Sequence, residues 1–428
     1  MRRVVSFALL SLTVAACGGA PDPEPAAVQE APMPGAGAIA YVDANIWDGT
    51  GSPARTDVAL VVRDGVIEGL FQDVPEGAEV VSLRDQWIIP GLINTHGHVS
   101  GRWAPDGVTD PADQVRGDLA LYARYGITTV LSLGGAPDAA FAVRGEPSPL
   151  ARLLVAGEVV ADETPVAATE TANAKLQRGV DWMKLRVDDN LGTGSKMPWE
   201  AVQATIDTAA SANVPVATHI FYMDDAARLL EMGTGMIAHS VRDQAVTEDF
   251  VQALLESGVC YVPTLVREVS TFVYSERPDW FEDPFFLEAA KQSEIDRVSE
   301  PDFQAQVAAS PAAAGYRVAL EQAKDNLSTL AASGVPVAFG TDSGPAGRFP
   351  GYFEHLEIEL MTEAGLSPRE ILLSATSVAA ECLALEEVGT LEPGKQADFV
   401  VLNGDPLADI RATREIDSVY VGGRPVSR

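Results

Sequence analysis

The sequence is short of cysteine and of basic residues, and each shortage narrows what the protein can be. Three cysteines in 428 residues cannot build a disulfide framework or a cysteine-rich zinc site. Cys260 and Cys382 stand in unrelated segments, and we expect them to be core residues with no disulfide framework implied. Lysine and arginine number 30 against 61 acidic residues, for a net charge of −31. A surface this negative repels phosphate backbones, which argues against a nucleic-acid partner.

The apolar run at the N-terminus is too short to span a bilayer as a mature helix. Two arginines precede this run, "VVSFALLSLTV", and "VAAC" follows it, which resembles the lipobox of bacterial lipoproteins. We expect residues 1–17 to be a lipoprotein signal peptide, Cys17 the acylated anchor, and residues 18–37 a flexible tether. Gly18 after the cysteine predicts an outer-membrane protein facing the periplasm. The alternative is a plain signal peptide with an incidental cysteine.

The rest of the chain shows two kinds of secondary-structure pattern. Residues 38–87 and 387–428 consist of short β-like runs, and "VALVVRDGVIEGL" carries the signature of a hairpin. We expect these two ends to pair into one small sheet domain. Residues 88–386 alternate eight candidate strands with helical stretches that mostly end in Gly or Asn. This rhythm predicts an α/β fold, a (β/α)8 TIM barrel with its active site at the carboxyl ends of the strands.

One segment of the predicted barrel breaks this alternation. Residues 267–315 are long, acidic and aromatic, and include "YSERPDWFEDPFF". Loops of this length are more often functional than idle, so the segment could cover the substrate as a lid. Packed helices on the surface are the alternative.

Several polar side chains fall near the carboxyl ends of the candidate strands. Read with a period of two, the strands bring one set to the same rim: His96, His98, Lys184, His219, His239 and Asp342. Two imidazoles at i and i+2 on one strand can bind a metal ion whose other ligands come from neighbouring strands. A single histidine at a strand end is more often structural, so the prediction rests on four of the five histidines meeting at one rim.

Together these motifs resemble the amidohydrolase superfamily of metal-dependent hydrolases. The similar segments are "PGLINTHGHV", "VATHI", "IAHS", "FGTDS" and the closing "LSPREILLSATSVAAECLALEEVGTLEPGKQADFVVLNGDPL". The resemblance covers about residues 38–428 and implies a β-sandwich, built from both chain ends, beside the barrel. The lysine in "WMKLRV" further resembles the prolidase-like and imidazolonepropionase-like branch. Asn94 departs from the family, which usually carries aspartate at this position.

The resemblance implies two divalent metal ions, Zn²⁺ first, with Mn²⁺ or Co²⁺ as alternatives. The implied ligands are His96, His98 and Asp342 for one ion, His219 and His239 for the other, and Lys184 as a bridging carbamate. Lys184 could instead pair with Asp188. Asp342 would also pass the proton of a metal-bridging hydroxide to the leaving amine. Tyr222 is the candidate donor to the oxyanion, or else a packed tyrosine at the rim, and His355 is either near the site or structural.

The predicted function is hydrolysis of the amide bond in a dipeptide, an N-acyl amino acid or a cyclic amide. Lactone or ester hydrolysis on the same metal centre is the second possibility. Deamination is disfavoured, because mononuclear deaminases of the superfamily do not need the strand-four lysine. A non-catalytic, ligand-binding lipoprotein is the alternative from another class, and the full ligand set argues against it. We expect a small-molecule substrate, membrane contact through the lipid anchor only, and leave a homo-oligomer open.

Overall fold

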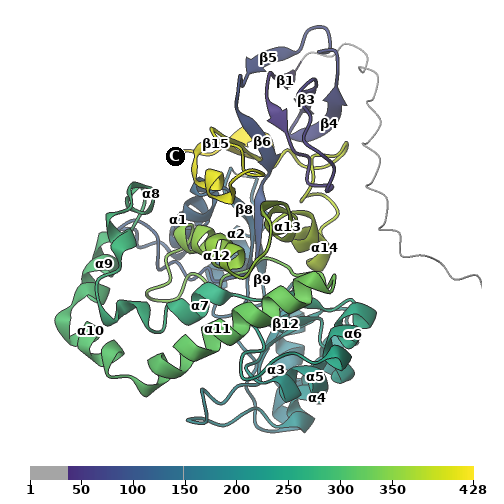
Figure 1. Cartoon of the computed structure of the whole chain (residues 1–428). Coiled ribbons are helices and arrows are strands. Elements are labelled where there is room, and N and C mark those ends of the chain that lie inside the picture. Colours follow the sequence, from purple (N-terminus) through teal and green to yellow (C-terminus); the bar gives the residue numbers. More distant parts are fainter. Residues whose placement is uncertain (1–36, 148) are drawn as a thin grey trace, which may run out of the picture.

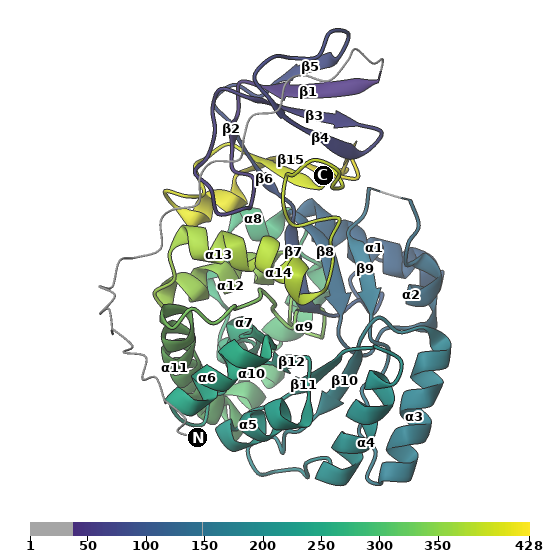
Figure 2. The ribbon, with the colours of Figure 1, turned by 90° about the vertical axis from the view of Figure 1, so that its right-hand side faces the viewer.

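The computed structural model describes residues 37–147 and 149–428, so the predicted signal peptide and Cys17 lie outside the described residues. Figures 1 and 2 place a small mixed sheet at one end of the molecule and a layer of helices at the other. Between them lie the parallel strands that carry the predicted ligands. None of the helices in the described ranges has the length and apolar character needed to cross a bilayer.

The outermost sheet comes from the N-terminal part of the chain. Its order is β4-β3-β1-β5. The strands are β1 (Ala38–Val42), β3 (Ala59–Arg63), β4 (Val66–Phe71) and β5 (Glu79–Ser82). The predicted hairpin is confirmed: β3 and β4 pair antiparallel across Asp64 and Gly65, whose φ angles of 52° and 83° are both left-handed. Two consecutive residues with positive φ match the right-handed twist of the strands they connect.

The second small sheet joins the two ends of the chain. Its order is β16-β15-β14-β6-β2. The strands are β2 (Asn45–Ile46), β6 (Trp87–Pro90), β14 (Phe399–Leu402), β15 (Ile416–Val421) and β16 (Arg424–Pro425). The centre of the sheet is the antiparallel pair of β6 with β14. Tyr41 of the outer sheet packs on Phe399 of this one, with ring centroids 5.0 Å apart, so the two sheets share buried aromatic contacts. The boundaries at 87/88 and 386/387 stay predictions.

The parallel strands form two further sheets. One contains β7 (Leu92–Gly97), β8 (Ile127–Ser132) and β9 (Arg152–Val155), and the other contains β10 (Met183–Arg186), β11 (Val216–His219), β12 (Met236–Ala238) and β13 (Cys260–Val262). Single parallel bridges connect them: Val160 to Leu185, Tyr261 to Val337, and Gly97 to Ser343.

The prediction of an eighth strand over residues 335–343 was wrong. This segment makes only the two bridges at Val337 and Ser343 and no continuous strand pairing. The physical reason is its backbone, which turns left-handed at Asp342 (φ 58°) and again at Gly344 (φ 108°) and cannot remain extended there.

Helices follow the parallel strands as the sequence predicts. They are α1 (Pro111–Arg124), α2 (Asp138–Val143), α3 (Pro165–Arg178), α4 (Trp199–Ala210), α5 (Met223–Met232) and α6 (Glu248–Ser257). Figure 2 shows α3 to α6 on the outer side of the sheet that contains β10 to β12. The expected glycine ends are confirmed at Gly233 and Gly258, which cap α5 and α6 in the left-handed conformation. The remaining elements after the parallel strands are α11 (Pro311–Ala332), α12 (Tyr352–Glu363), α13 (Pro368–Ser374), α14 (Ser377–Cys382) and η3 (Ile410–Arg414).

The long segment after β13 is a series of short helices. They are α7 (Leu265–Val269), η1 (Val273–Ser275), η2 (Asp279–Glu282), α8 (Pro284–Leu287), α9 (Gln292–Ser299) and α10 (Pro301–Ala308). Aromatic rings pack these helices together and against the rest of the molecule: Phe281 stacks on Phe286 within the segment, and Trp280 stacks on Tyr352 of α12, each pair at 5.2 Å. Of the two possibilities left open by the sequence, packed helices describe the segment; a lid function stays a prediction.

The expectation for the last two cysteines was wrong. Cys260 at the start of β13 and Cys382 at the end of α14 form a disulfide, with Cα atoms 5.7 Å apart. The partners are 122 residues apart in the sequence, so no local spacing could have indicated the bond. Only the fold brings them together.

Candidate metal centre

The predicted histidine ligands lie at or just beyond the carboxyl ends of the parallel strands, and Lys184 lies inside its strand. His96 is the fifth residue of β7, Lys184 is the second residue of β10 and His219 ends β11, whereas His239 directly follows β12. His239 and Asp342 have positive φ angles of 74° and 58°. Left-handed backbone is costly for residues other than glycine and collects at functional sites, where the surrounding structure holds it in place.

The imidazole rings form one cluster. The centroids of His219 and His239 are 4.1 Å apart, those of His96 and His239 are 4.7 Å apart, and those of His96 and His98 are 5.7 Å apart. One ligand atom each from His96, His239 and Asp342 lies within 4.8 Å of the others, and all three residues are buried. The structure therefore brings together four histidines and an aspartate from four distant segments of the sequence.

The chemistry of this donor set fits divalent metal ions. Burial, together with the charge of Lys184, holds the pKa of His96 well below its usual value, and burial beside the other imidazoles does the same for His239. Their rings are therefore neutral and offer a lone pair, as a metal ligand must. The Nδ1 atom of His96 is buried and has no hydrogen-bond partner in the described part of the chain.

Lys184 lies inside this cluster. Its side chain is buried, and its Nζ atom is 3.4 Å from Nε2 of His96. Burial lowers the pKa of Lys184 to about 7, although the charge of Asp342 opposes the change. The amine is thus substantially uncharged near neutral pH, and an uncharged amine is nucleophilic. The alternative partner, Asp188, instead accepts a hydrogen bond from Nε2 of His219 at 2.8 Å.

His219 and His239 are each held by a residue outside the predicted ligand set. The bond from His219 holds the pKa of Asp188 below its usual value, although burial acts in the opposite direction. Nδ1 of His239 is hydrogen-bonded to Oγ1 of Thr264 at 2.6 Å. Such partners fix the tautomer and orientation of a metal-binding imidazole. Sequence reasoning missed Thr264, and it named Asp188 only as an alternative partner of Lys184.

Asp342 joins the cluster to a basic side chain. Its Oδ1 atom lies 2.6 Å from Nε2 of His98, and its Oδ2 atom accepts a hydrogen bond from Arg348. Burial would raise the pKa of Asp342, but Arg348 and His98 outweigh it and hold the pKa well below its usual value. Asp342 is therefore a carboxylate throughout the neutral pH range. Arg348 carries no signal in the sequence beyond its place in the loop "GPAGRFPG".

The departure at Asn94 has a structural explanation. The amide of Asn94 donates to Oε1 of the buried Glu354 at 2.6 Å and to Thr341 at 2.9 Å, and its carbonyl oxygen accepts from the backbone of His96 at 2.9 Å. An aspartate in this position would place a second carboxylate against Glu354, and such like charges repel. Asparagine therefore donates a hydrogen bond to Glu354 of α12 without adding a second negative charge.

Two further candidates make other contacts. The Tyr222 hydroxyl donates to Oδ1 of Asp189 at 2.8 Å, and the Lys196 ammonium lies 4.0 Å from the centroid of its ring. Its role as a catalytic donor stays a prediction. His355 is buried in α12, where Nε2 bonds to the backbone oxygen of Tyr125 at 2.9 Å. His355 is thus structural, the second of the two possibilities raised by the sequence.

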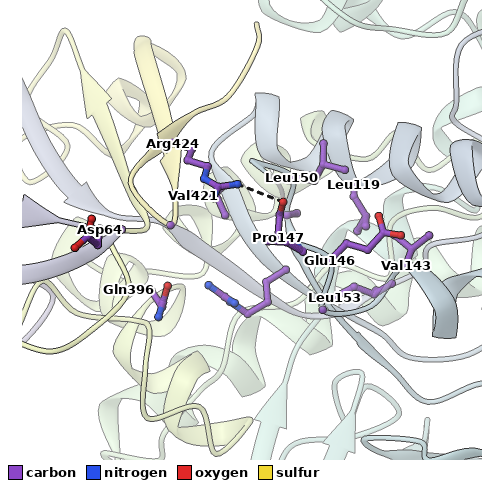
Figure 3. A pocket seen from close by; sticks show the side chains of 15 residues that line it. Asp64, Leu119, Val143, Glu146, Pro147, Leu150, Leu153, Gln396, Val421 and Arg424 are labelled. Atoms are coloured by element: carbon purple, nitrogen blue, oxygen red, sulfur yellow. Dashed lines mark hydrogen bonds between the residues drawn. The ribbon is translucent and has the colours of Figure 1, made fainter. Parts of the chain in front are cut away.

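A separate cavity of about 330 Å³ lies where the small sheets meet α1 and α2 (Figure 3). Its lining includes Asp64, Arg152, Gln396 and Arg424, and Arg424 donates to the backbone oxygen of Pro147 at 3.3 Å. None of the predicted metal ligands lines it. The chemistry of the chain is therefore assigned to the histidine cluster, and not to this cavity.

Comparisons with known proteins agree with this architecture. An uncharacterized protein of Mycobacterium tuberculosis is 29% identical over 233 residues, which cover 51% of this chain and 60% of that protein. The imidazolonepropionase of Deinococcus radiodurans is 24% identical, with 86% of this chain and 91% of that protein covered. A putative prolidase from Bifidobacterium longum has a similar structure, with a TM-score of 0.73 at 23% identity over 93% of this chain and 96% of that one.

The match to a family covers most of the chain. Residues 87–426 match the amidohydrolase family. Enzymes of this family are typically metal-dependent, in agreement with the buried group of His96, His239 and Asp342. The chain therefore belongs to the amidohydrolase family, whose members are hydrolases acting on carbon–nitrogen bonds.

Proposed function

We propose that the protein is a metal-dependent hydrolase that cleaves an amide bond in a dipeptide, an N-acyl amino acid or a cyclic amide. The observation that carries the proposal is the cluster of imidazoles beside Lys184 and Asp342. We also propose that the two parallel sheets belong to one (β/α)8 barrel beside a β-sandwich. The parallel bridges at Val160, Val337 and Ser343 support the first part.

Two divalent ions, Zn²⁺ first with Mn²⁺ or Co²⁺ as alternatives, would supply an acidified water and polarise the scissile carbonyl when bound. In this proposal His96, His98 and Asp342 would hold one ion, His219 and His239 would hold the other, and Lys184, as a carbamate, would contribute to holding both. Asp188 and Thr264 would hold the imidazoles of the second ion in place through the bonds they already make.

Asp342 would act as the proton carrier. Its low pKa keeps it ionised, so it can accept a proton from the attacking water and deliver it to the leaving nitrogen. His98 and Arg348 fix its two oxygens in different directions. Tyr222 would donate to the oxyanion only after releasing Asp189, and Tyr222→Phe tests that role against the alternative of a packed tyrosine.

We further propose that the protein is exported to the cell envelope and held there by a lipid on Cys17, on the periplasmic face of the outer membrane. The disulfide between Cys260 and Cys382 supports export, because such bonds persist in oxidising compartments. Expression of Cys17→Ser with lipid labelling tests the anchor. Loss of labelling and of membrane association is expected, and normal labelling of the variant would contradict it.

The function is tested with metal-free protein reconstituted in turn with Zn²⁺, Mn²⁺ and Co²⁺. Elemental analysis should find two ions per chain, and hydrolysis should be assayed on dipeptides, N-acyl amino acids, cyclic amides and lactones. We expect turnover of at least one amide class, with loss of one ion in His219→Ala. Turnover of lactones alone would favour the ester-hydrolase alternative. Absence of metal binding and of all turnover would leave the non-catalytic alternative.

A further inference from the structure

Arginine side chains gather around the candidate centre of this acidic chain. Their partners are Asp188 for Arg186, Glu268 for both Arg242 and Arg267, and Asp342 for Arg348. Four guanidinium groups thus share three carboxylates. Because each guanidinium carries five N–H donors, the sharing leaves donors that a further anion could use.

Arg267 has such a donor. Its side chain is 8% exposed, and Nη1 is engaged by Glu268 at 2.9 Å. Its Nε is buried and has no hydrogen-bond partner among the described residues. The guanidinium lies 4.5 Å from the ring centroid of Tyr316 and close enough to the cluster for its charge to act on His219 and Asp342. A buried donor without a partner costs free energy that a bound acceptor would recover.

Arg348 is linked to the backbone of Arg267 through the Ser270 hydroxyl. Its Nε donates to the Ser270 hydroxyl at 3.0 Å, and that hydroxyl donates to the backbone oxygen of Arg267 at 2.6 Å. Its other anchor is Asp342, a carboxylate it already shares with His98. A metal ion bound by Asp342 would weaken the ion pair between Asp342 and Arg348, because one carboxylate would then interact with more cations.

We propose that Arg267 and Arg348 bind a carboxylate of the substrate, so that the enzyme acts on anionic amides in which the leaving nitrogen stands one carbon from a carboxylate. N-acyl amino acids and dipeptides with a free C-terminus belong to this class. The inference rests on the proposed function, in which Asp342 protonates the leaving nitrogen. A carboxylate one carbon away from that nitrogen would lie next to the guanidinium that contacts Asp342. Guanidinium and carboxylate form paired, charge-assisted hydrogen bonds.

The test compares substrates that differ only in this charge. N-acetyl derivatives of leucine, proline and phenylalanine are assayed as acids and as primary amides with the metal-loaded protein. We expect kcat/KM to favour the acid by about 10- to 100-fold, the range for a lost charge-assisted contact. Because Arg348 also holds Asp342, Arg348→Met should lower kcat/KM for the neutral amide as well, but it should lower kcat/KM for the acid by about a further 10-fold or more and so remove most of the preference. Arg348→Lys should retain part of it, because lysine keeps the charge but lacks the fork.

The matched control is Arg277→Met, because Arg277 lies with Arg267 in the segment 267–315, is half exposed and pairs with Glu282. It should leave the preference unchanged. Arg267 is tested in the same way with Arg267→Met. Because Arg267 is buried and this variant could fail to fold, Arg267→Lys, which keeps the charge, is measured beside it. An equal loss on acids and amides in Arg348→Met would assign the residue to positioning Asp342 only, and would overturn the proposal.

Binding provides the second readout. Isothermal titration of the same acids and amides into the metal-loaded protein should show tighter binding of the acids, and Arg348→Met should weaken it. If neither member of any pair is hydrolysed but the acids still bind more tightly, the proposed function fails for these compounds and the carboxylate site stands. If acids bind no more tightly than amides, or nothing binds, the carboxylate site is overturned.

Discussion

The two sides of the candidate centre are held in different ways. On the Asp342 side, the predicted ligands bind one another, since His98 contacts Asp342 at 2.6 Å and His96 lies 3.5 Å from the same oxygen. On the His219 side, each imidazole bonds to a residue outside the set, Asp188 or Thr264. The His219 side is therefore oriented by the protein before any ion arrives. Under the proposed function, the bonds among His96, His98 and Asp342 would give way to an ion, so the charges on this side would carry more of the chemistry.

Removal of the Asp342 charge should have the largest effect. Asp342→Asn keeps the shape of the side chain but cannot carry the proton to the leaving group, and it leaves Arg348 without its carboxylate. We expect kcat to fall by about 10³- to 10⁴-fold. Elemental analysis should show weakened binding on the Asp342 side only. Wild-type kcat in this variant would remove Asp342 from the mechanism.

Loss of Lys184, which lies between the two sides, should have the next largest effect. An unmodified amine with a pKa of about 7 is a poor bridge between two cations, whereas its carbamate would offer one oxygen to each. We expect Lys184→Ala to lower kcat by about 10²- to 10³-fold, as for a lost group acting directly on the chemistry. Short-chain carboxylic acids added to the variant should restore part of the activity by occupying the vacated space.

Full metal content and full activity in Lys184→Ala would show that the lysine is structural. Mass spectrometry of the metal-loaded protein under CO₂ offers a direct check, since a carbamate adds the mass of CO₂. Absence of any such adduct, with no rescue by carboxylic acids, would contradict the bridge while leaving the rest of the centre in place.

A smaller effect is expected for Asp188, which positions His219. Asp188→Asn keeps a hydrogen-bonding group but loses the charge that orients the imidazole. We expect a loss of about 10- to 100-fold in metal affinity or activity, confined to the His219 side. Asp207→Asn on the exposed face of α4 is the matched control. If Asp188→Asn weakened both sides equally, the contrast between them would be wrong.

The residues themselves show how far the sequence could lead. The histidines and Asp342 could be placed because strand ends are marked by apolar runs, and the carboxyl ends of parallel strands meet at one edge. Arg348, Thr264 and the pairing of Asp188 with His219 could not be placed, because these contacts depend on left-handed turns at His239, Thr264 and Asp342 that no local pattern announces. The prediction of an eighth strand was wrong for the same reason.

Contacts between segments far apart in the chain could not be read from the sequence either. The helices of residues 267–315 could be recognised only as an interruption, since their packing depends on aromatic partners in α12. Likewise Cys260 and Cys382 meet only because β13 and α14 are adjacent in the fold.

The disulfide gives the smallest expected effect on activity and the clearest effect on stability. Cys260 begins β13, at the end of the strand opposite to the predicted ligands, so the bond does not contact either side of the centre. It closes a loop of 122 residues, and cross-links of this kind typically stabilise a folded chain by about 2–5 kcal/mol. We therefore expect the double variant Cys260→Ala, Cys382→Ala to unfold at lower temperature or denaturant while its kcat stays within about twofold of wild type. A fall in kcat as large as that of Asp188→Asn would mean that the amino ends of the strands govern the geometry of the centre. In that case the difference between its two sides would originate in the parallel sheets as a whole and not in the local partners Asp188 and Thr264.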